Sequence, residues 1–109
     1  MTSSADRVWK ALADPTRRAI LDRLAKAPRS TGQLCAQFTR EGLGRTGVMK
    51  HLDVLVQAEL VLIRRAGRTR WNHLNPVPIQ RVCDRWVSRH VRDLASSAAR
   101  LKSVVEAQS

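Results

Sequence analysis

The stretch that most constrains the fold is Arg45–Ala58, because it predicts an amphipathic helix that ends just before a short hairpin. Val48, Leu52, Leu55 and Val56 recur at helical spacing and predict one apolar stripe. The opposite side of this helix carries the side chains of Arg45, Thr46, Met49, Lys50 and Asp53. A short helix with a guanidinium, a hydroxyl, a thioether and an ammonium near its start is suited to entering a groove.

The segment after this helix predicts two short strands, at about residues 60–65 and 69–75, joined by a turn at Ala66-Gly67-Arg68. The arginines of this hairpin are Arg64, Arg65, Arg68 and Arg70. Alternate residues of a strand point to opposite faces, so these four side chains cannot all reach one partner. Arg68, at the tip, is the strongest candidate for such a contact.

Short helices are also predicted before this stretch. A first helix ends before Asp14, which suits an N-cap, and Pro15 suits the first position of a second helix over residues 15–25. Ser30 and Gln33 fit a capping box that opens a third helix of about two turns.

Asn75-Pro76 repeats the cap-plus-proline pattern and opens a long last helix. Some 30 residues would extend about 45 Å, which is longer than one small domain can cover. The apolar stripe of this helix therefore predicts a second copy of the chain as its partner in a twofold dimer. The predicted dimer contacts on the first and last helices are Val8, Trp9, Leu12, Ile79, Val82, Trp86, Val87, Val91, Leu94 and Leu101. An aromatic pocket for a small ligand around Trp9 and Trp86 is the alternative.

Composition limits the classes of partner. The 109 residues include 20 Lys and Arg against nine Asp and Glu, a net charge of +11, which favours a polyanionic partner, either nucleic acid or anionic lipid. No run of about 18 apolar residues predicts a membrane span, and no signal peptide is predicted. Cys35 and Cys83 are too few for a disulfide framework. We therefore expect a cytoplasmic protein.

Residues 11–24, 48–61 and 64–76, taken together, resemble the ArsR-type family of bacterial winged-helix repressors. The resemblance implies a mainly α fold with a small β-hairpin, a winged helix-turn-helix of five helices and a two-stranded wing. It implies a single domain over residues 1–109, with a core at 4–75, the wing at 60–75 and a dimerisation helix at 76–106. It also implies a homodimer, formed through the first and last helices, that binds an inverted-repeat operator in double-stranded DNA and blocks transcription.

The sequence departs from that family at several positions. The arsenic and cadmium sensors of the family carry a Cys-x-Cys pattern, whereas this chain has Cys35-Ala36-Gln37. Asp84 and His90 do not have the spacing of the ligands in the zinc sensors. We therefore expect no metal and no cofactor. Gly44-Arg45 replaces the usual Ser-Gln opening of the recognition helix. Glu59 replaces the glycine that usually ends that helix, and so must adopt a left-handed conformation or a different turn.

These observations assign a set of DNA contacts. Arg45 is expected to bind guanine O6 and N7, and Met49 to pack on a thymine methyl. Thr46, Lys50 and His51 are expected to contact phosphates, with a histidine packed under the helix as the alternative for His51. The wing contributes Arg64, Arg65, Arg68 and Arg70.

Other functions remain as alternatives. Scattered histidines and carboxylates, without a phosphate-binding loop or a nucleophile motif, predict that the chain is not an enzyme. A thiol-based redox or metalloid sensor using Cys35 or Cys83, and a nonspecific basic nucleic-acid-binding protein, are the alternatives. An unidentified small-molecule inducer, if there is one, is expected to act by changing the spacing between the two recognition helices.

Overall fold

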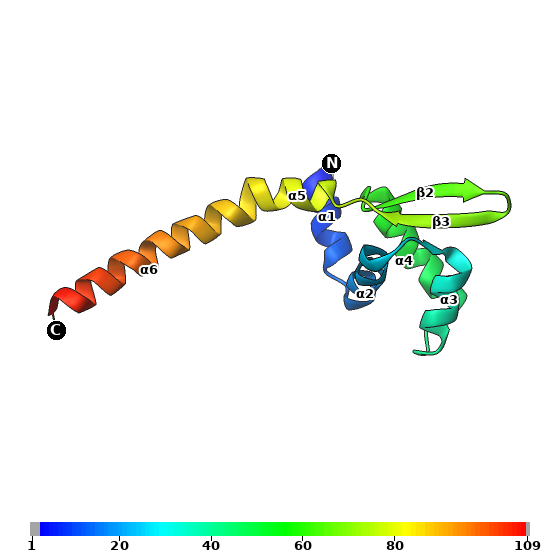
Figure 1. Cartoon of the computed structure of the whole chain (residues 1–109), viewed down its shortest axis with the longest axis horizontal. Coiled ribbons are helices and arrows are strands. Elements are labelled where there is room, and N and C mark those ends of the chain that lie inside the picture. Colours follow the sequence, from blue (N-terminus) through cyan, green and yellow to red (C-terminus); the bar gives the residue numbers. More distant parts are fainter. Residues whose placement is uncertain (1–2, 109) are drawn as a thin grey trace. The chain divides into compact units, whose positions relative to one another are not determined.

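A computed structural model describes residues 3–108. The chain divides into two compact units, one up to Ile79 and the other from Gln80 onwards. The first unit holds the short helices and the sheet, and the second is helical (Figure 1). The two units are described separately below.

The helices of the first unit begin where the capping residues predict. Asp14 accepts hydrogen bonds from the backbone amides of Thr16 and Arg17, at 2.8 and 3.1 Å, and Pro15 occupies the first helical position. Ser30 and Gln33 form the predicted capping box. The helices are α1 (Ser4–Leu12), α2 (Pro15–Lys26), α3 (Thr31–Thr39) and α4 (Arg45–Gln57), and each lies within one or two residues of its predicted bounds where these were given.

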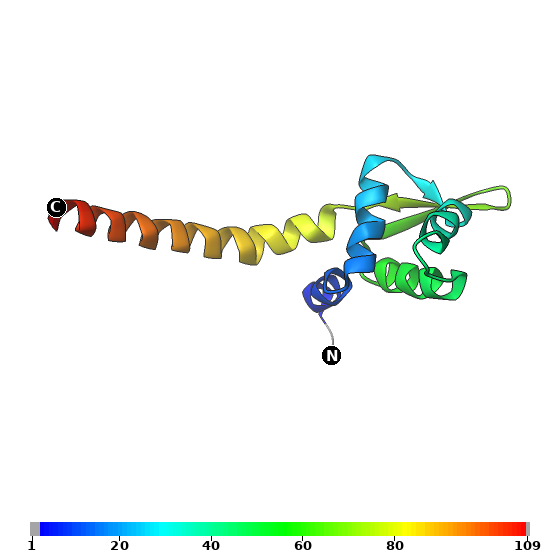
Figure 2. The ribbon, with the colours of Figure 1, turned by 90° about the horizontal axis from the view of Figure 1, so that it is seen from below.

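The sheet has a third strand that the sequence analysis did not predict. β2 (Val61–Ala66) and β3 (Thr69–Leu74) form the antiparallel hairpin, and β1 (Arg29–Ser30) pairs with the other edge of β3. The predicted two-stranded wing is therefore part of a three-stranded sheet in the order β1-β3-β2. Figure 2 shows β1 joining the sheet just before α3. Two residues are too few to produce an alternating pattern, so this strand leaves no periodic signal.

The core of the first unit lies between the helices and the sheet. The predicted stripe of α4 is confirmed for Val48, Leu52 and Leu55, each 0% exposed, whereas Val56 is half-buried. α2 and α3 both pack against β3. The core is completed by buried side chains from the other elements, including Ala11, Ile20, Leu21, Leu24, Leu34, Phe38, Leu60 and Val61.

The link from α4 to β2 contains a left-handed residue. Glu59 has φ 61°, so of the two predicted alternatives it adopts the left-handed conformation and not a different turn. The amide of Glu59 donates to the carbonyl of Val56 at 2.9 Å, and that of Leu60 donates to the carbonyl of Leu55 at 3.0 Å. These two bonds, with buried Leu55 and Leu60 beside them, are those of a Schellman motif, which usually has glycine at the left-handed position.

A helical run over residues 77–108 follows the sheet. It comprises α5 (Val77–Val82), a π-helical turn η1 (Cys83–Val87) and α6 (Ser88–Gln108). The π-turn was not predicted. In this turn the guanidinium of Arg85 lies 5.4 Å from the ring centre of Trp86. Within residues 3–108, no helix is both long and apolar enough to span a bilayer.

Candidate nucleic-acid interface

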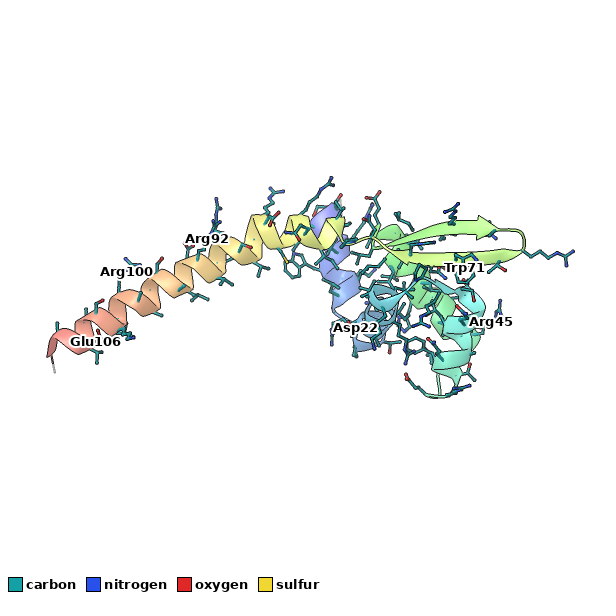
Figure 3. All side chains as sticks on the ribbon, viewed as in Figure 1. Asp22, Arg45, Trp71, Arg92, Arg100 and Glu106 are labelled. Atoms are coloured by element: carbon teal, nitrogen blue, oxygen red, sulfur yellow. The ribbon has the colours of Figure 1, made fainter. Side chains whose placement is uncertain are left out.

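The start of α4 presents exposed polar side chains. Arg45, Thr46 and Lys50 are exposed, while the stripe of the same helix is buried. The N-cap is Gly44, which provides no side-chain hydrogen bond to the first turn. The amides of that turn lack a capping side chain, and such amides attract anions at a helix N-terminus. Figure 3 labels Arg45 at this end of α4.

Met49 does not lie on the exposed face as predicted. It is half-buried and packs against the core cluster. Met49 is three residues before Leu52 and next to Val48, so it lies on the border of the buried stripe. The side chain of Met49 is therefore partly buried in the interior of the protein.

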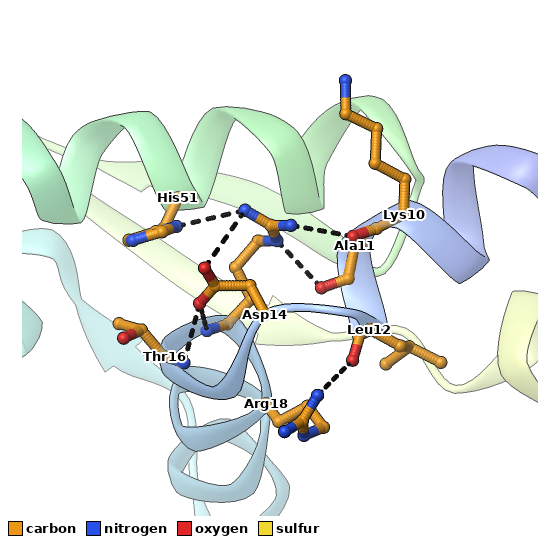
Figure 4. Close-up of polar contacts among 8 residues, drawn as sticks. Lys10, Ala11, Leu12, Asp14, Thr16, Arg18 and His51 are labelled. Carbon is orange, nitrogen blue, oxygen red and sulfur yellow. Dashed lines mark hydrogen bonds and ion pairs between the residues drawn. The ribbon is translucent and has the colours of Figure 1, made fainter.

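His51 contacts Arg17 from α2 rather than projecting freely. The distance from Nη1 of Arg17 to Nδ1 of His51 is 3.3 Å, and His51 is half-buried (Figure 4). Arg17 Nε donates to the carbonyl of Ala11 at 2.8 Å, and Nη2 donates to the carbonyl of Lys10 at 2.8 Å. The donors of the Arg17 guanidinium therefore face the protein. The packed alternative describes His51 better than an open phosphate contact does.

Asp14 completes this group. Its carboxylate lies 3.9 Å from Arg17 Nη1. Burial alone raises the pKa of Asp14, but the two backbone hydrogen bonds from Arg17 and Thr16, with the nearby charges of His51 and Arg17, together lower it below its usual value. The ionised form of Asp14 therefore caps α2 and helps to hold Arg17 in place.

The wing arginines are divided by the strand register. Arg64 pairs with Trp71 on one face of the hairpin, whereas Arg65 pairs with Arg70 on the other. Arg70 is half-buried, and its Nε is buried without a hydrogen-bond partner in the described part of the chain. Arg68 lies in the turn after Gly67, which has φ 61°. Trp71 is labelled on β3 in Figure 3.

Among the residues that the structure describes, the cations at the start of α4 and on the hairpin have no carboxylate partner. Within residues 3–108, the ion pairs are Asp14–Arg17, Arg23–Glu41 and Lys102–Glu106. None of them involves Arg45, Lys50 or an arginine of the wing. The start of α4 and the hairpin thus carry positive charge that the described chain does not neutralise.

The residues assigned to a dimer contact differ in exposure. Val8 and Val82 are 1% and 6% exposed, and Leu12 and Ile79 are partly buried against the core, so these four have little surface to offer. The periodicity of a sequence indicates an apolar face but not what covers that face, so it predicts these four residues as dimer contacts together with the exposed ones. The exposed members are Trp9, Trp86, Val87, Val91, Leu94 and Leu101.

The thiols and acidic groups do not form a cluster. Cys35 is buried and Cys83 is half-buried. In the part of the chain that the structure describes, no three side chains of His, Cys, Asp or Glu are arranged to hold a metal ion.

Asn72, at the centre of β3, was missed by the sequence analysis. It is 0% exposed, and its Nδ2 donates to the carbonyl of Arg29 at 3.2 Å and to Oγ1 of Thr31 at 3.1 Å. These bonds tie β3, which carries Arg70 and Trp71, to β1 and to the start of α3. A polar residue in mid-strand was the available signal.

Comparisons with known proteins agree with this fold. Residues 12–64 match the model of a helix-turn-helix domain family. The HTH-type transcriptional regulator Rv2034 of Mycobacterium tuberculosis is 47% identical over 73 residues, which are 67% of this chain and 65% of that protein. The transcriptional repressor SdpR of Bacillus subtilis is 33% identical over 75 residues, which are 69% of this chain and 80% of that protein.

Comparison with solved structures identifies the same class of protein. An ArsR-like transcriptional regulator from Rhodococcus sp. RHA1 aligns with TM-score 0.74 and 27% identity, covering 95% of this chain and 92% of its own. The homodimeric winged helix-turn-helix DNA-binding domain of Mb0332 from Mycobacterium bovis aligns with TM-score 0.61 and 29% identity, covering 83% of this chain and 79% of its own. The chain belongs to the ArsR-type family of winged helix-turn-helix transcriptional regulators.

Proposed function

We propose that this chain is a dimeric transcriptional repressor that binds an inverted-repeat operator in double-stranded DNA. Helix α4 enters the major groove, with Arg45 reading a base and Thr46 and Lys50 contacting phosphates. Two copies related by a twofold axis present their α4 helices to half-sites about 34–36 Å apart. The homodimeric state of the Mb0332 domain and the repressor function of SdpR support these two parts of the proposal. Such a protein acts in the cytoplasm, where the bacterial chromosome lies.

The observation that carries DNA binding is the pairing of Arg65 with Arg70. Like charges directly opposite each other on neighbouring strands destabilise a hairpin. A phosphate group close to both guanidinium groups would replace this repulsion with charge-assisted hydrogen bonds. The hairpin is therefore better suited to the DNA-bound state than to the free state.

The two states can be separated by experiment. Arg65→Ala should leave the free protein as stable or slightly more stable, because the repulsion with Arg70 is lost. The same variant should weaken DNA binding about equally for all sequences and reduce the salt slope of binding by about 1. Arg92→Ala, an equal loss of charge at an exposed position of α6, is the matched control. Chemical denaturation and fluorescence anisotropy across a salt series provide the two measurements.

Base reading needs its own test. A duplex selected from random DNA should bind at least about 10³-fold more tightly than a scrambled duplex. Arg45→Ala should cost about 1–3 kcal/mol of that discrimination at one base pair of each half-site. Equal affinity for selected and scrambled DNA would instead identify a nonspecific binder, and an unchanged preference in Arg45→Ala would remove Arg45 from base recognition.

A further inference from the structure

The start of the recognition helix α4 lacks the polar cap that the neighbouring helices have. The N-cap residues of α1, α2 and α3 are Ser3, Asp14 and Ser30, and the side chain of each accepts a hydrogen bond from an amide of the first turn. The N-cap of α4 is Gly44, which has no side chain to accept such a bond. Because a polar cap stabilises the point at which a helix begins, another contact has to fix the start of α4.

Leu43, the residue before this N-cap, lies against Gly47 in the first turn of α4. A β-carbon on residue 47 would lie 2.6 Å from Cδ1 and 3.2 Å from Cγ of Leu43, whereas carbon atoms in contact are about 3.5–4.0 Å apart. The side chain of Leu43 therefore occupies the space that the β-carbon of any other residue at position 47 would need. Leu43 is half-buried and also packs against the core.

The position of Leu43 is that of the first residue in a hydrophobic staple. In this motif the residue before the N-cap packs near the fourth helical residue and fixes the angle at which the chain enters the helix. The fourth residue of α4 is Val48, which is 0% exposed and whose amide donates to the carbonyl of Gly44 at 3.1 Å. Gly47 comes directly before Val48, and its missing side chain lets Leu43 approach the helix.

The loop between α3 and α4 is also held at its other end. The guanidinium of Arg23, from α2, pairs with the carboxylate of Glu41 and lies 3.9 Å from the ring centre of Phe38. The carbonyl of Phe38 accepts hydrogen bonds from the amides of Glu41 and Leu43, at 3.0 Å each. The loop therefore has defined contacts at Glu41 and at Leu43, and Leu43 is the nearer of the two to the helix.

We propose that Gly47 is a positioning residue for DNA recognition, because the space beside it holds Leu43 and so fixes the first turn of α4. This inference rests on the proposed function and adds how its contacts are held in place. Arg45 and Thr46, which are proposed to contact a base and a phosphate, lie between Leu43 and Gly47 in the chain. The contact thus closes the short segment that contains both. Glycine is, after proline, the least favourable residue within a helix, and this role explains its presence in the recognition helix.

A double-mutant cycle tests this role against a direct clash of residue 47 with DNA. Gly47→Ala displaces Leu43, so we expect the ratio of affinities for the selected and the scrambled duplex to fall at least tenfold. Leu43→Ala should cause a similar fall. In the Leu43→Ala background, Gly47→Ala should cause no further loss, because the side chain that it displaces is already absent. A β-carbon that clashes with DNA would instead reduce affinity by the same factor in both backgrounds, and this result would overturn the inference.

Gly32 provides the matched control. It lies in the first turn of α3, and a β-carbon there would lie 3.9 Å from Oγ of Ser30, which is an ordinary contact. Gly32→Ala makes the same chemical change at the start of a helix without displacing a neighbour, so it should leave the ratio of affinities unchanged. Chemical denaturation should show both glycine variants to be folded under the conditions of the binding assay. An equal fall of the ratio in the two variants would contradict the role of Leu43.

Amide hydrogen exchange gives a second measurement that needs no DNA. The amide of Leu43 donates to the carbonyl of Phe38, so its exchange rate should rise at least tenfold in Gly47→Ala and stay unchanged in Gly32→Ala. An unchanged rate in Gly47→Ala would overturn the inference even if DNA binding were weaker. A wild-type chain that binds both duplexes equally would overturn the proposed function and the inference together. A wild type that discriminates, with a ratio of affinities that Gly47→Ala does not alter, would overturn the inference alone.

Discussion

The guanidinium of Arg17 lies 3.3 Å from Nδ1 of His51 and so joins the start of α2 to the recognition helix α4. Arginine has only hydrogen-bond donors, so its guanidinium is the donor in this contact. The same guanidinium bonds to the carbonyls of Lys10 and Ala11, which belong to α1. One side chain thus connects α1, α2 and α4.

Replacing Arg17 should therefore destabilise the first unit. Its side chain is 14% exposed, and removal of hydrogen bonds from a largely buried charged group costs about 1–3 kcal/mol. Arg17→Ala should lower the free energy of unfolding by this amount in urea denaturation. Arg18→Ala, which removes an exposed guanidinium that bonds to the carbonyl of Leu12, should cost much less. Equal losses for the two variants would contradict the role of Arg17.

The lowered pKa of Asp14 predicts a dependence of stability on acid. A carboxyl whose pKa is lower in the folded state stabilises the fold above its unfolded pKa, and this contribution is lost as the pH falls through the folded pKa. The contribution of Asp14 should therefore be complete at pH 7 and decline below about pH 4.

Two variants separate the charge of Asp14 from its capping role. Asp14→Ala should lower the free energy of unfolding by about 1 kcal/mol at pH 7, because the N-cap is lost. Asp14→Asn keeps an acceptor for the cap and should lose less. Urea denaturation from pH 2.5 to 7 would show the gap between wild type and Asp14→Asn narrowing in acid; a gap that widens would contradict the lowered pKa.

Asn72 should be a stabilising polar group in an otherwise apolar interior. Asn72→Ala removes the hydrogen bonds to the carbonyl of Arg29 and to Oγ1 of Thr31, which should cost about 1–3 kcal/mol. Thr31→Val removes one of these bonds from the other side. A double-mutant cycle in chemical denaturation should give a coupling of at least about 0.5 kcal/mol, and additive effects would show that the side chains act independently.

Glu59 should be replaceable with a gain in stability. A residue with a Cβ pays about 1–2 kcal/mol in the left-handed conformation, and glycine avoids this cost but has a more flexible unfolded chain. Glu59→Gly should therefore raise the free energy of unfolding by about 0.5–1 kcal/mol. Glu59→Ala removes the charge but keeps the Cβ, so a gain in that control as well would assign the effect to charge rather than to the backbone. Thermal denaturation is sufficient to compare them.

The local signals in the sequence were reliable where one short segment determines the result. The capping residues Asp14 and Ser30 predicted helix starts, and the period of Val48, Leu52 and Leu55 predicted a buried face. A left-handed conformation was one of two predicted for Glu59, the other being a different turn. Each depends on backbone geometry within a few residues. Such geometry is the same in any fold that contains the segment.

Features that depend on distant partners were not predictable. β1 is formed because Arg29 and Ser30 meet Asn72 and Trp71, some forty residues away along the chain. The helical spacing predicts Met49 on the exposed side of α4, because the spacing does not show the core residues of other elements that pack against it. The apolar spacing of the first helix predicts an interface at Val8, because an apolar face has the same spacing whether its own chain or a second copy covers it.

The π-turn determines how the length of the chain can vary. Val82 and Val87 are five residues apart, whereas an α-helix returns to the same side after three or four. The π-turn takes in one extra residue, so both valines return to nearly the same side. If one residue were removed from this turn, a plain α-helix would still place these two valines on nearly the same side. If one residue were added, α6 would be rotated and the two valines would lie on different sides. Deletion should therefore be tolerated here and insertion should not.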